Sequence, residues 1–258
     1  MNRTSHGIAF RLAGNGEPLL LLHGLLASGA MFDPLIELLR DRFRLLIPDL
    51  RGHGQSGDHG GPYDVPALTS DLDMVLAEAR FGPCSVLGYS HGGAVAQQLA
   101  LRRPEVVERL VLTCTYACNV ATLKERLEAN LLAALLCCIS PATLANVIVR
   151  PAKPRANGAI GLTPEQAEWA RGILAVNRAP AMRGAVRGLL TFDSRPWLHQ
   201  LKMPTLVIGG THDIAVPRHH FDTLVNGIPG ATGRLIDRAG HALAWTHTRE
   251  LAGLLIAQ

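Results

Sequence analysis

Short hydrophobic runs alternate along most of the chain with segments whose hydrophobic residues recur at helical spacing. Continuous hydrophobic runs are typical of strands in a parallel sheet that is covered on both faces. The pattern therefore predicts an α/β fold with a mostly parallel central sheet and helices on both of its faces. The predicted strands are 18–24, 43–49, 84–90, 109–115, 204–210 and 232–238. The predicted helices are 31–42, 64–81, 92–107, 219–227 and 248–258.

The alternation stops between residues 121 and 195, where every signal is helical. Leucines recur there at every fourth position, and prolines separate further helical stretches. We predict that residues 121–195 form a helical cap, inserted into a sheet domain that residues 1–120 and 196–258 make together.

Two features of the predicted cap bear on substrate choice. Its run "LLAALLCCI" (131–139) is hydrophobic on every helical face, so either it packs onto the sheet domain or Leu132 and Leu135 line a substrate pocket. The cap also holds ten Lys or Arg against five Asp or Glu, whereas the rest of the chain has a net charge of −1. This charge either attracts substrates with a remote carboxylate or phosphate, or is only a solvated surface.

A strained turn around one serine is predicted where the third hydrophobic run meets a helix. The pentapeptide "GYSHG" (88–92) fits the pattern G-x-S-x-G between a strand and a helix. At such an elbow the serine side chain is pushed above the sheet, and Gly88 and Gly92 let neighbouring backbone pass close by. Ser90 is therefore the candidate nucleophile, and a glycine-rich turn that happens to contain a serine is the alternative.

A nucleophilic serine needs a base and a group that orients the base. Asp213 comes just after the run 204–210, and His241 follows the last predicted strand. The chain order Ser90, Asp213, His241 is the order of one of three common serine-hydrolase architectures. Asp213 and His241 could each be an ordinary loop residue, but three matches at strand ends favour a catalytic triad.

Negative charge on an attacked carbonyl oxygen needs preorganised N–H donors. The turn after "LLLLHG" (19–24) directs the backbone N–H of Leu25 towards the nucleophile, and His91 supplies a second N–H at the helix start. These two groups are the candidate oxyanion hole. The side chain of His23 is expected to shape its turn by hydrogen bonding, and that of His91 to point off the elbow helix.

The motifs resemble the α/β-hydrolase fold superfamily, in its small capped branch of esterases, lactonases and C–C bond hydrolases. The resemblance runs through "LLHG", "PDLRGHGQSG", "GYSHGG", "VIGGTHD" and "AGH", and so covers nearly the whole chain. It implies the same nucleophile, acid, base and oxyanion donors as above, with the variable cap at 121–195. It further implies that Asp49 and His53 belong to a structural turn. Members with an aspartate nucleophile are disfavoured, because position 90 is serine.

Composition narrows the classes of function. The net charge is +4, but lysine occurs at only three positions and the arginines are scattered, so a nucleic-acid partner is not expected. No signal-peptide pattern opens the sequence and no hydrophobic run approaches the roughly 20 residues of a membrane span, so we expect a cytoplasmic protein. The five cysteines lack CxxC spacing and have no histidine near them in the sequence, which predicts buried thiols and no metal site. The thiols in apolar surroundings are those of Cys114, Cys118, Cys137 and Cys138.

Together these features predict a serine hydrolase that cleaves a small-molecule carboxylic ester, lactone or thioester through an acyl-enzyme, without a metal or organic cofactor. Three alternatives on the same fold stay open: a C–C bond hydrolase, a cofactor-independent lyase or oxygenase, and a ligand receptor of low turnover. The pattern fixes neither the acyl and alcohol parts of the substrate nor the oligomeric state.

Overall fold

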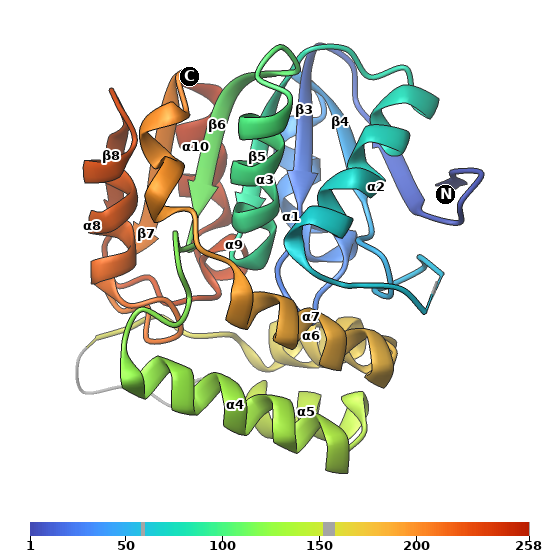
Figure 1. Cartoon of the computed structure of the whole chain (residues 1–258), viewed down its shortest axis with the longest axis vertical. Helices are drawn as coiled ribbons and strands as arrows, with labels where there is room; N and C mark the ends of the chain where they lie inside the picture. The colour runs from blue at the N-terminus through green and yellow to red at the C-terminus, as the bar shows by residue number, and fades with distance from the viewer. Residues whose placement is uncertain (58–59, 152–157, 258) are drawn as a thin grey trace.

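The computed structural model describes residues 1–57, 60–151 and 158–257. In these residues the strands of the central sheet follow the order β1-β2-β4-β3-β5-β6-β7-β8 (Figure 1). β3 to β8 run parallel to one another, whereas β1 and β2 form an antiparallel edge in which β2 pairs antiparallel with β4. This confirms the predicted α/β fold with a mostly parallel sheet. The strands are β1 (Asn2–Arg3), β2 (Ala9–Ala13), β3 (Glu17–Leu22), β4 (Phe43–Pro48), β5 (Cys84–Tyr89), β6 (Val107–Thr113), β7 (Thr205–Gly210) and β8 (Thr232–Ile236).

The six parallel strands are the six predicted ones, with bounds that differ by no more than two residues. The two antiparallel strands were not predicted. β1 is only two residues long, and β2 changes from buried to partly exposed along its length. Neither strand therefore makes the continuous hydrophobic run that marks the centre of a covered sheet.

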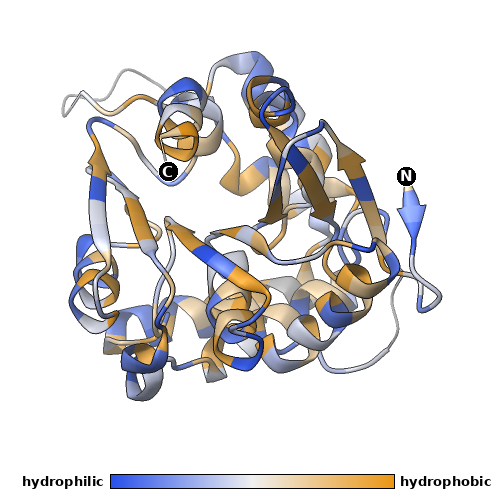
Figure 2. Ribbon diagram, turned by 90° about the horizontal axis from the view of Figure 1, so that it is seen from above, coloured by the Kyte–Doolittle hydropathy of each residue, from blue (hydrophilic) through white to orange (hydrophobic). Residues whose placement is uncertain are grey.

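Helices cover both faces of the sheet, and the hydrophobic strands lie between them (Figures 1 and 2). The side chains of β3 show why its run is continuous. Leu19 and Leu21 pack in the cluster that includes α1 and α10, whereas Leu20 and Leu22 pack in the cluster that includes α2, α3 and α8. Every side chain of such a strand is buried, so each must be hydrophobic. These helices are α1 (Asp33–Leu39), α2 (Val65–Glu78), α3 (His91–Arg102), α8 (Arg218–Gly227), α9 (Leu243–Thr246) and α10 (Thr248–Ile256), of which only α9 was not predicted.

Within the described part of the 121–195 segment the chain forms helices, which Figure 1 places beyond the carboxyl ends of the parallel strands. Capping boxes at Thr122 with Glu125, and at Thr163 with Gln166, fix two of the helix starts. We call these four elements the inserted helices. Their treatment as a cap domain separate from the sheet domain stays a prediction. They are α4 (Leu123–Cys138), α5 (Pro141–Ile148), α6 (Pro164–Ala175) and α7 (Ala179–Thr191).

One hydrophobic face of α4 is turned to solvent. Ala129 is buried and Leu132 is partly buried, but the leucines on the opposite side lie in water. The interpretation that the whole run 131–139 packs onto the sheet domain is therefore wrong for its solvent-facing leucines. The exposed leucines and their exposed fractions are Leu123 at 73%, Leu127 at 62%, Leu131 at 61% and Leu135 at 42%.

Two expectations from composition can be compared with the structure. Cys114 and Cys118 are buried as predicted, whereas Cys138 is exposed at the end of α4, and the side chain of Cys137 lies outside the described residues. No helix in the described ranges combines the length and the hydropathy that a membrane span requires. A cytoplasmic location stays a prediction.

Candidate active site

Ser90 lies at the turn between β5 and α3 in a backbone conformation that few residues other than glycine adopt. Its φ is 53° and its ψ is −120°, which is a strained conformation for a residue with a side chain. A Cβ at Gly88 would lie 2.5 Å from the carbonyl oxygen of Gly92, and a Cβ at Gly92 would lie 2.3 Å from that of Leu22. Glycine at these two positions therefore allows the close backbone approach that the elbow requires.

A chain of hydrogen bonds links Ser90, His241 and Asp213. The Nε2 atom of His241 lies 3.1 Å from Ser90 Oγ, and its Nδ1 atom lies 2.9 Å from Asp213 Oδ2. The other carboxylate oxygen of Asp213 accepts hydrogen bonds from the N–H groups of Ala215 and Val216, at 3.0 and 2.9 Å. The three side chains follow β5, β7 and β8. They meet because parallel strands bring their carboxyl ends to the same edge of the sheet.

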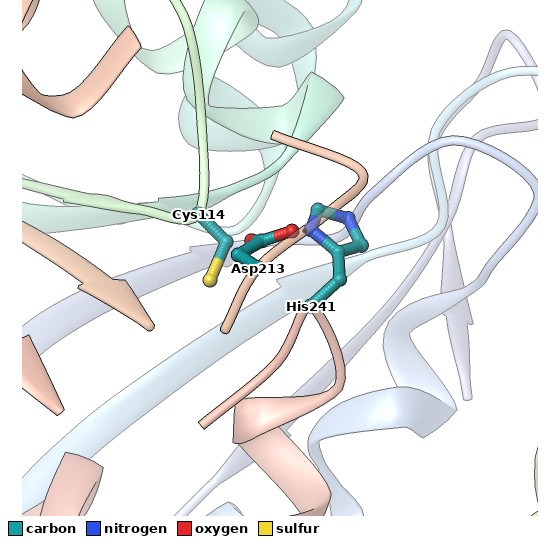
Figure 3. Close-up of side chains that lie close together, drawn as sticks. All are labelled: Cys114, Asp213 and His241. Atoms are coloured by element: carbon teal, nitrogen blue, oxygen red, sulfur yellow. Dashed lines mark hydrogen bonds and ion pairs between the residues drawn. The ribbon is translucent and has the colours of Figure 1, made fainter. Parts of the chain in front are cut away.

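Two buried side chains that the sequence did not mark support this chain of hydrogen bonds. Cys114 follows β6 with a φ of 48°, and its thiol, which lies beside Asp213 in Figure 3, donates a hydrogen bond to the carboxylate. The hydroxyl of Tyr89 donates a hydrogen bond to the carbonyl oxygen of His241. No histidine is near Cys114 in the sequence, but in the fold its Sγ lies within 4.8 Å of the nearest ligand-type atoms of Asp213 and His241.

The electrostatics of this group suit a histidine base. Burial lowers the pKa of His241, but the charge of Asp213 and its hydrogen bond outweigh burial, so the pKa lies above its ordinary value. Burial raises the pKa of Asp213, but the charge and hydrogen bond of His241 outweigh it, so that pKa lies below its ordinary value. Asp213 is thus ionised at neutral pH and can stabilise a positive charge on His241.

The two candidate oxyanion donors flank Ser90. His91 N–H stands at the first position of α3, directly after the serine. Leu25 follows Gly24, where a Cβ would lie 3.2 Å from Ser90 Cβ, so this turn passes close to the serine. Within the part of the chain that the structure describes, neither N–H group donates a hydrogen bond to another protein group.

The histidine side chains next to the elbow have structural partners. His23 Nδ1 lies 2.8 Å from the carbonyl oxygen of Gly24, and its Nε2 accepts a hydrogen bond from Leu50 N–H at 2.9 Å. His91 Nδ1 lies 3.0 Å from the hydroxyl of Tyr116. Burial lowers the pKa of His23 to about 4 and that of His91 to about 3, so both side chains are neutral. These contacts make His23 and His91 scaffold side chains.

The loop after β4 is also held by its own polar groups. The carboxylate of Asp49 accepts hydrogen bonds from the N–H groups of Gly29 and Gln55, both at 2.7 Å. His53 Nδ1 lies 3.0 Å from the carbonyl oxygen of Arg51. The contacts fit the structural turn that the family resemblance implies.

Two cavities open beside Ser90 and His241. The first, which we call the apolar cavity, measures about 350 Å³, and the second, which we call the acidic cavity, about 300 Å³. Leu25 and Ala215 contribute to both. The apolar cavity is further lined by Met31, Val149, Arg150, Leu162, Leu174 and Trp245. The acidic cavity is further lined by Tyr116, Asn119, Glu125, Glu128, Leu132 and Leu189.

The structure separates the two leucines that were predicted to line a pocket. Leu132 faces the acidic cavity. Leu135 is 42% exposed and lines neither cavity, because it lies on the solvent face of α4. We therefore retain Leu132 as a candidate substrate contact and withdraw Leu135.

Asn177, in the turn between α6 and α7, ties the inserted helices to the loop beside Ser90. Its Nδ2 donates a hydrogen bond to the carbonyl oxygen of Leu26 at 2.6 Å, and its Oδ1 accepts one from Gly54 N–H at 2.9 Å. The residue is 5% exposed, and Leu26 has a φ of 64°. The sequence gives no signal for this contact, because the partners of Asn177 lie 151 and 123 positions away.

Comparison with known proteins places the chain in a family. The family model of the alpha/beta hydrolase fold matches residues 17–248, so the chain belongs to this family. It is 31% identical over 249 residues to the pimeloyl-[acyl-carrier protein] methyl ester esterase of Nitrosomonas europaea, with 91% of this chain and 92% of that protein covered. It is 26% identical over 238 residues to a putative carbamate hydrolase of Azorhizobium caulinodans, with 91% and 88% covered. A solved hydrolase structure from Pseudomonas aeruginosa superposes with a TM-score of 0.86 at 27% identity, over 97% of this chain and 93% of that chain. The predicted family resemblance is confirmed.

Proposed function

We propose that this protein is a serine hydrolase that transfers the acyl group of a small carboxylic ester, lactone or thioester to Ser90 and then to water. The observation that carries the proposal is the hydrogen-bond chain from Ser90 Oγ through His241 to Asp213, which starts at a strained elbow between two cavities. The esterase and hydrolase relatives, aligned over about nine tenths of the chain, support the same class of reaction.

The reaction follows from the positions of the polar atoms. His241 Nε2 accepts the hydroxyl proton while Ser90 Oγ bonds to the carbonyl carbon, and Asp213 stabilises the imidazolium. The N–H groups of Leu25 and His91 bind the oxyanion. The imidazolium then protonates the departing oxygen or sulfur as the bond to the acyl group breaks. The same histidine then deprotonates a water, which attacks the acyl-enzyme, and it returns this proton to Ser90 Oγ as the bond to the acyl group breaks and the acid is released. No step involves a metal ion.

The linings of the two cavities support an assignment of the two parts of the substrate. A hydrophobic acyl group fits the apolar cavity, because contact with Met31, Leu174 and Trp245 there removes the apolar surface of the acyl group from water. The leaving group then occupies the acidic cavity, beside Glu125 and Glu128. Carboxylates in a partly enclosed site disfavour an anion and favour a neutral or cationic group that donates hydrogen bonds.

This assignment revises the expected preference for anionic substrates. Among the described residues that line the two cavities, Arg150 is the single Lys or Arg, and it lies at the apolar cavity. We therefore expect an anionic group to be tolerated only at the end of the acyl part, close to Arg150. The positive balance of residues 121–195 does not by itself favour anionic leaving groups.

A substrate screen tests the proposal. The purified protein is assayed with p-nitrophenyl esters of increasing chain length, lactones and thioesters, with Ser90→Ala as the test variant and Ser70→Ala, on the surface of α2, as the matched control. We expect turnover that is lost only in Ser90→Ala. Hydrolysis that persists in Ser90→Ala would contradict the proposal. Phosphonate labelling with negligible turnover of every substrate would instead favour a receptor, and cleavage restricted to vinylogous diketones a C–C bond hydrolase.

A further inference from the structure

A second group of metal-ligating side chains lies apart from the triad, where an inserted helix meets the sheet side. Glu125 comes from the first turn of α4, and His219 and His220 come from the first turn of α8. The Nε2 atoms of both histidines lie 2.9 Å from Glu125 Oε1. In the described ranges the only other such cluster is Cys114, Asp213 and His241, to which the proposed reaction gives a role.

The three side chains are arranged as a preorganised donor set. The two imidazole rings lie side by side, with centroids 4.0 Å apart, so their Nε2 atoms converge on one carboxylate oxygen. The other oxygen, Oε2, accepts a hydrogen bond from Thr122 N–H at 2.8 Å in the capping box. The helix cap therefore fixes the carboxylate and leaves Oε1 directed at the histidines.

Burial and access also suit an ion. The His220 side chain is 3% exposed and that of Glu125 12%, whereas the His219 side chain is 44% exposed and offers a path from solvent.

Two imidazole nitrogens and one carboxylate oxygen are a protein ligand set that suits Zn²⁺, with the fourth position left for water. Zn²⁺ binds such atoms at about 2.0–2.2 Å, which places tetrahedral ligands about 3.3 Å apart. The observed separations of 2.9 Å need only a small opening of the group to reach this geometry.

We propose that Glu125, His219 and His220 bind a transition-metal ion of the zinc type, which clamps α4 to α8. Glu125 also lines the acidic cavity, so the ion would hold one wall of that cavity in place. The ion takes no part in the chemistry at Ser90. The inference departs from the sequence-based expectation of no metal site, because the ligands come from positions 95 apart and only the fold brings them together.

Metal titration of the full-length protein tests this proposal. Chelator-treated protein is titrated with ZnCl₂ by calorimetry, and its thermal unfolding is followed with Zn²⁺ and with Mg²⁺. We expect one Zn²⁺ per chain and a rise in Tm with Zn²⁺ only. His219→Ala and Glu125→Gln should each weaken binding by about tenfold or more. Glutamine at position 125 retains the capping box, so loss of binding in this variant would report the lost ligand and not a damaged helix. The exposed His199→Ala serves as the matched control and should bind Zn²⁺ like the parent.

His241→Ala is the control for the other cluster, Cys114, Asp213 and His241, and this variant should still bind Zn²⁺. Absence of stoichiometric binding, equal affinity in the parent and in His219→Ala, or loss of binding in His241→Ala alone would overturn the proposal. Ester hydrolysis by the metal-free protein should persist. Failure of the metal site is therefore distinguishable from failure of the proposed hydrolase activity, which the Ser90→Ala comparison measures separately.

Discussion

The sheet side and the inserted helices contribute to the same site in different ways. The hydrogen-bonded side chains Ser90, Asp213 and His241 stand on loops that follow buried parallel strands, and backbone N–H groups also hold the carboxylate. The inserted helices instead supply much of the cavity walls, including Glu125 and Leu132. From this difference we expect the sheet side to determine the chemistry and the inserted helices to determine which substrates reach it. Changes on the sheet side should therefore lower kcat, and changes in the inserted helices should alter substrate preference.

The largest effect is expected from the nucleophile and the base. Ser90→Ala and His241→Ala should each lower kcat for a short ester by roughly ten-thousand-fold or more. Both residues stand on loops, so the far-ultraviolet circular dichroism and the Tm should stay close to those of the parent. Initial rates with purified variants check this. Substantial activity in either variant with an intact fold would contradict the assignment.

Asp213→Asn should cost nearly as much, about ten-thousand-fold in kcat, because an amide at this position favours the wrong tautomer of the histidine. Asp222→Asn, an exposed carboxylate of α8, is the matched control and should retain activity. Retention of most activity in Asp213→Asn would show that the orienting acid has been misassigned.

The pH dependence follows from the raised pKa of His241. The base must be neutral to accept the serine proton, so kcat/KM should fall about tenfold per pH unit below that pKa. Because the shift is upward, the acidic limb should lie above the ordinary histidine value of about 6.5. A pH–rate profile from 5 to 9 checks this, and a flat profile over that range would exclude a histidine base.

A smaller effect is expected from the thiol behind the carboxylate. Cys114→Ala removes the hydrogen bond to Asp213, so kcat should fall by roughly tenfold, whereas Cys114→Ser retains a donor and should restore most of the rate. Loss of the hydrogen bond should also raise the pKa of Asp213. Because Asp213 sets the pKa of its partner His241, the pH at which the acidic limb falls should shift in the alanine variant. Equal rates and profiles for parent, alanine and serine would show that Cys114 is only a packing residue.

The smallest effect is expected from the wall of the acidic cavity. Leu132→Trp should raise KM about tenfold for bulky leaving groups and leave small ones nearly unaffected, because the indole fills space beside Ser90. Leu135→Trp, one turn further on the exposed face, is the matched control. A series of esters with one acyl group and alcohols of increasing size measures the difference. The same size preference in both variants would remove Leu132 from the substrate site.

The features that could be predicted from the sequence are those that leave a local pattern in the chain. Continuous hydrophobic runs and the motif around Ser90 are local patterns, so the parallel strands and the elbow could be predicted within two residues. Asp213 and His241 could be found because they directly follow such strands. Each of these signals depends on residues that are neighbours in the chain.

Contacts between distant segments could not be predicted. Cys114 looked like a buried thiol without a histidine nearby, because His241 approaches it only in the folded sheet. Asn177 has no local pattern, and its partners lie more than a hundred positions away. Leu135 was assigned to a pocket because the run 131–139 is hydrophobic all round, so periodicity gave no indication of which face meets solvent.

The most direct test of the proposed nucleophile is to identify the residue that a serine-directed phosphonate modifies covalently. The purified protein is treated with a fluorophosphonate, and the labelled peptide is identified by mass spectrometry. We predict one phosphonyl group per chain, on Ser90, with labelling slowed strongly in His241→Ala and absent in Ser90→Ala. An active protein that carries no label at Ser90, or that carries it on another residue, would contradict the proposal that Ser90 is the nucleophile.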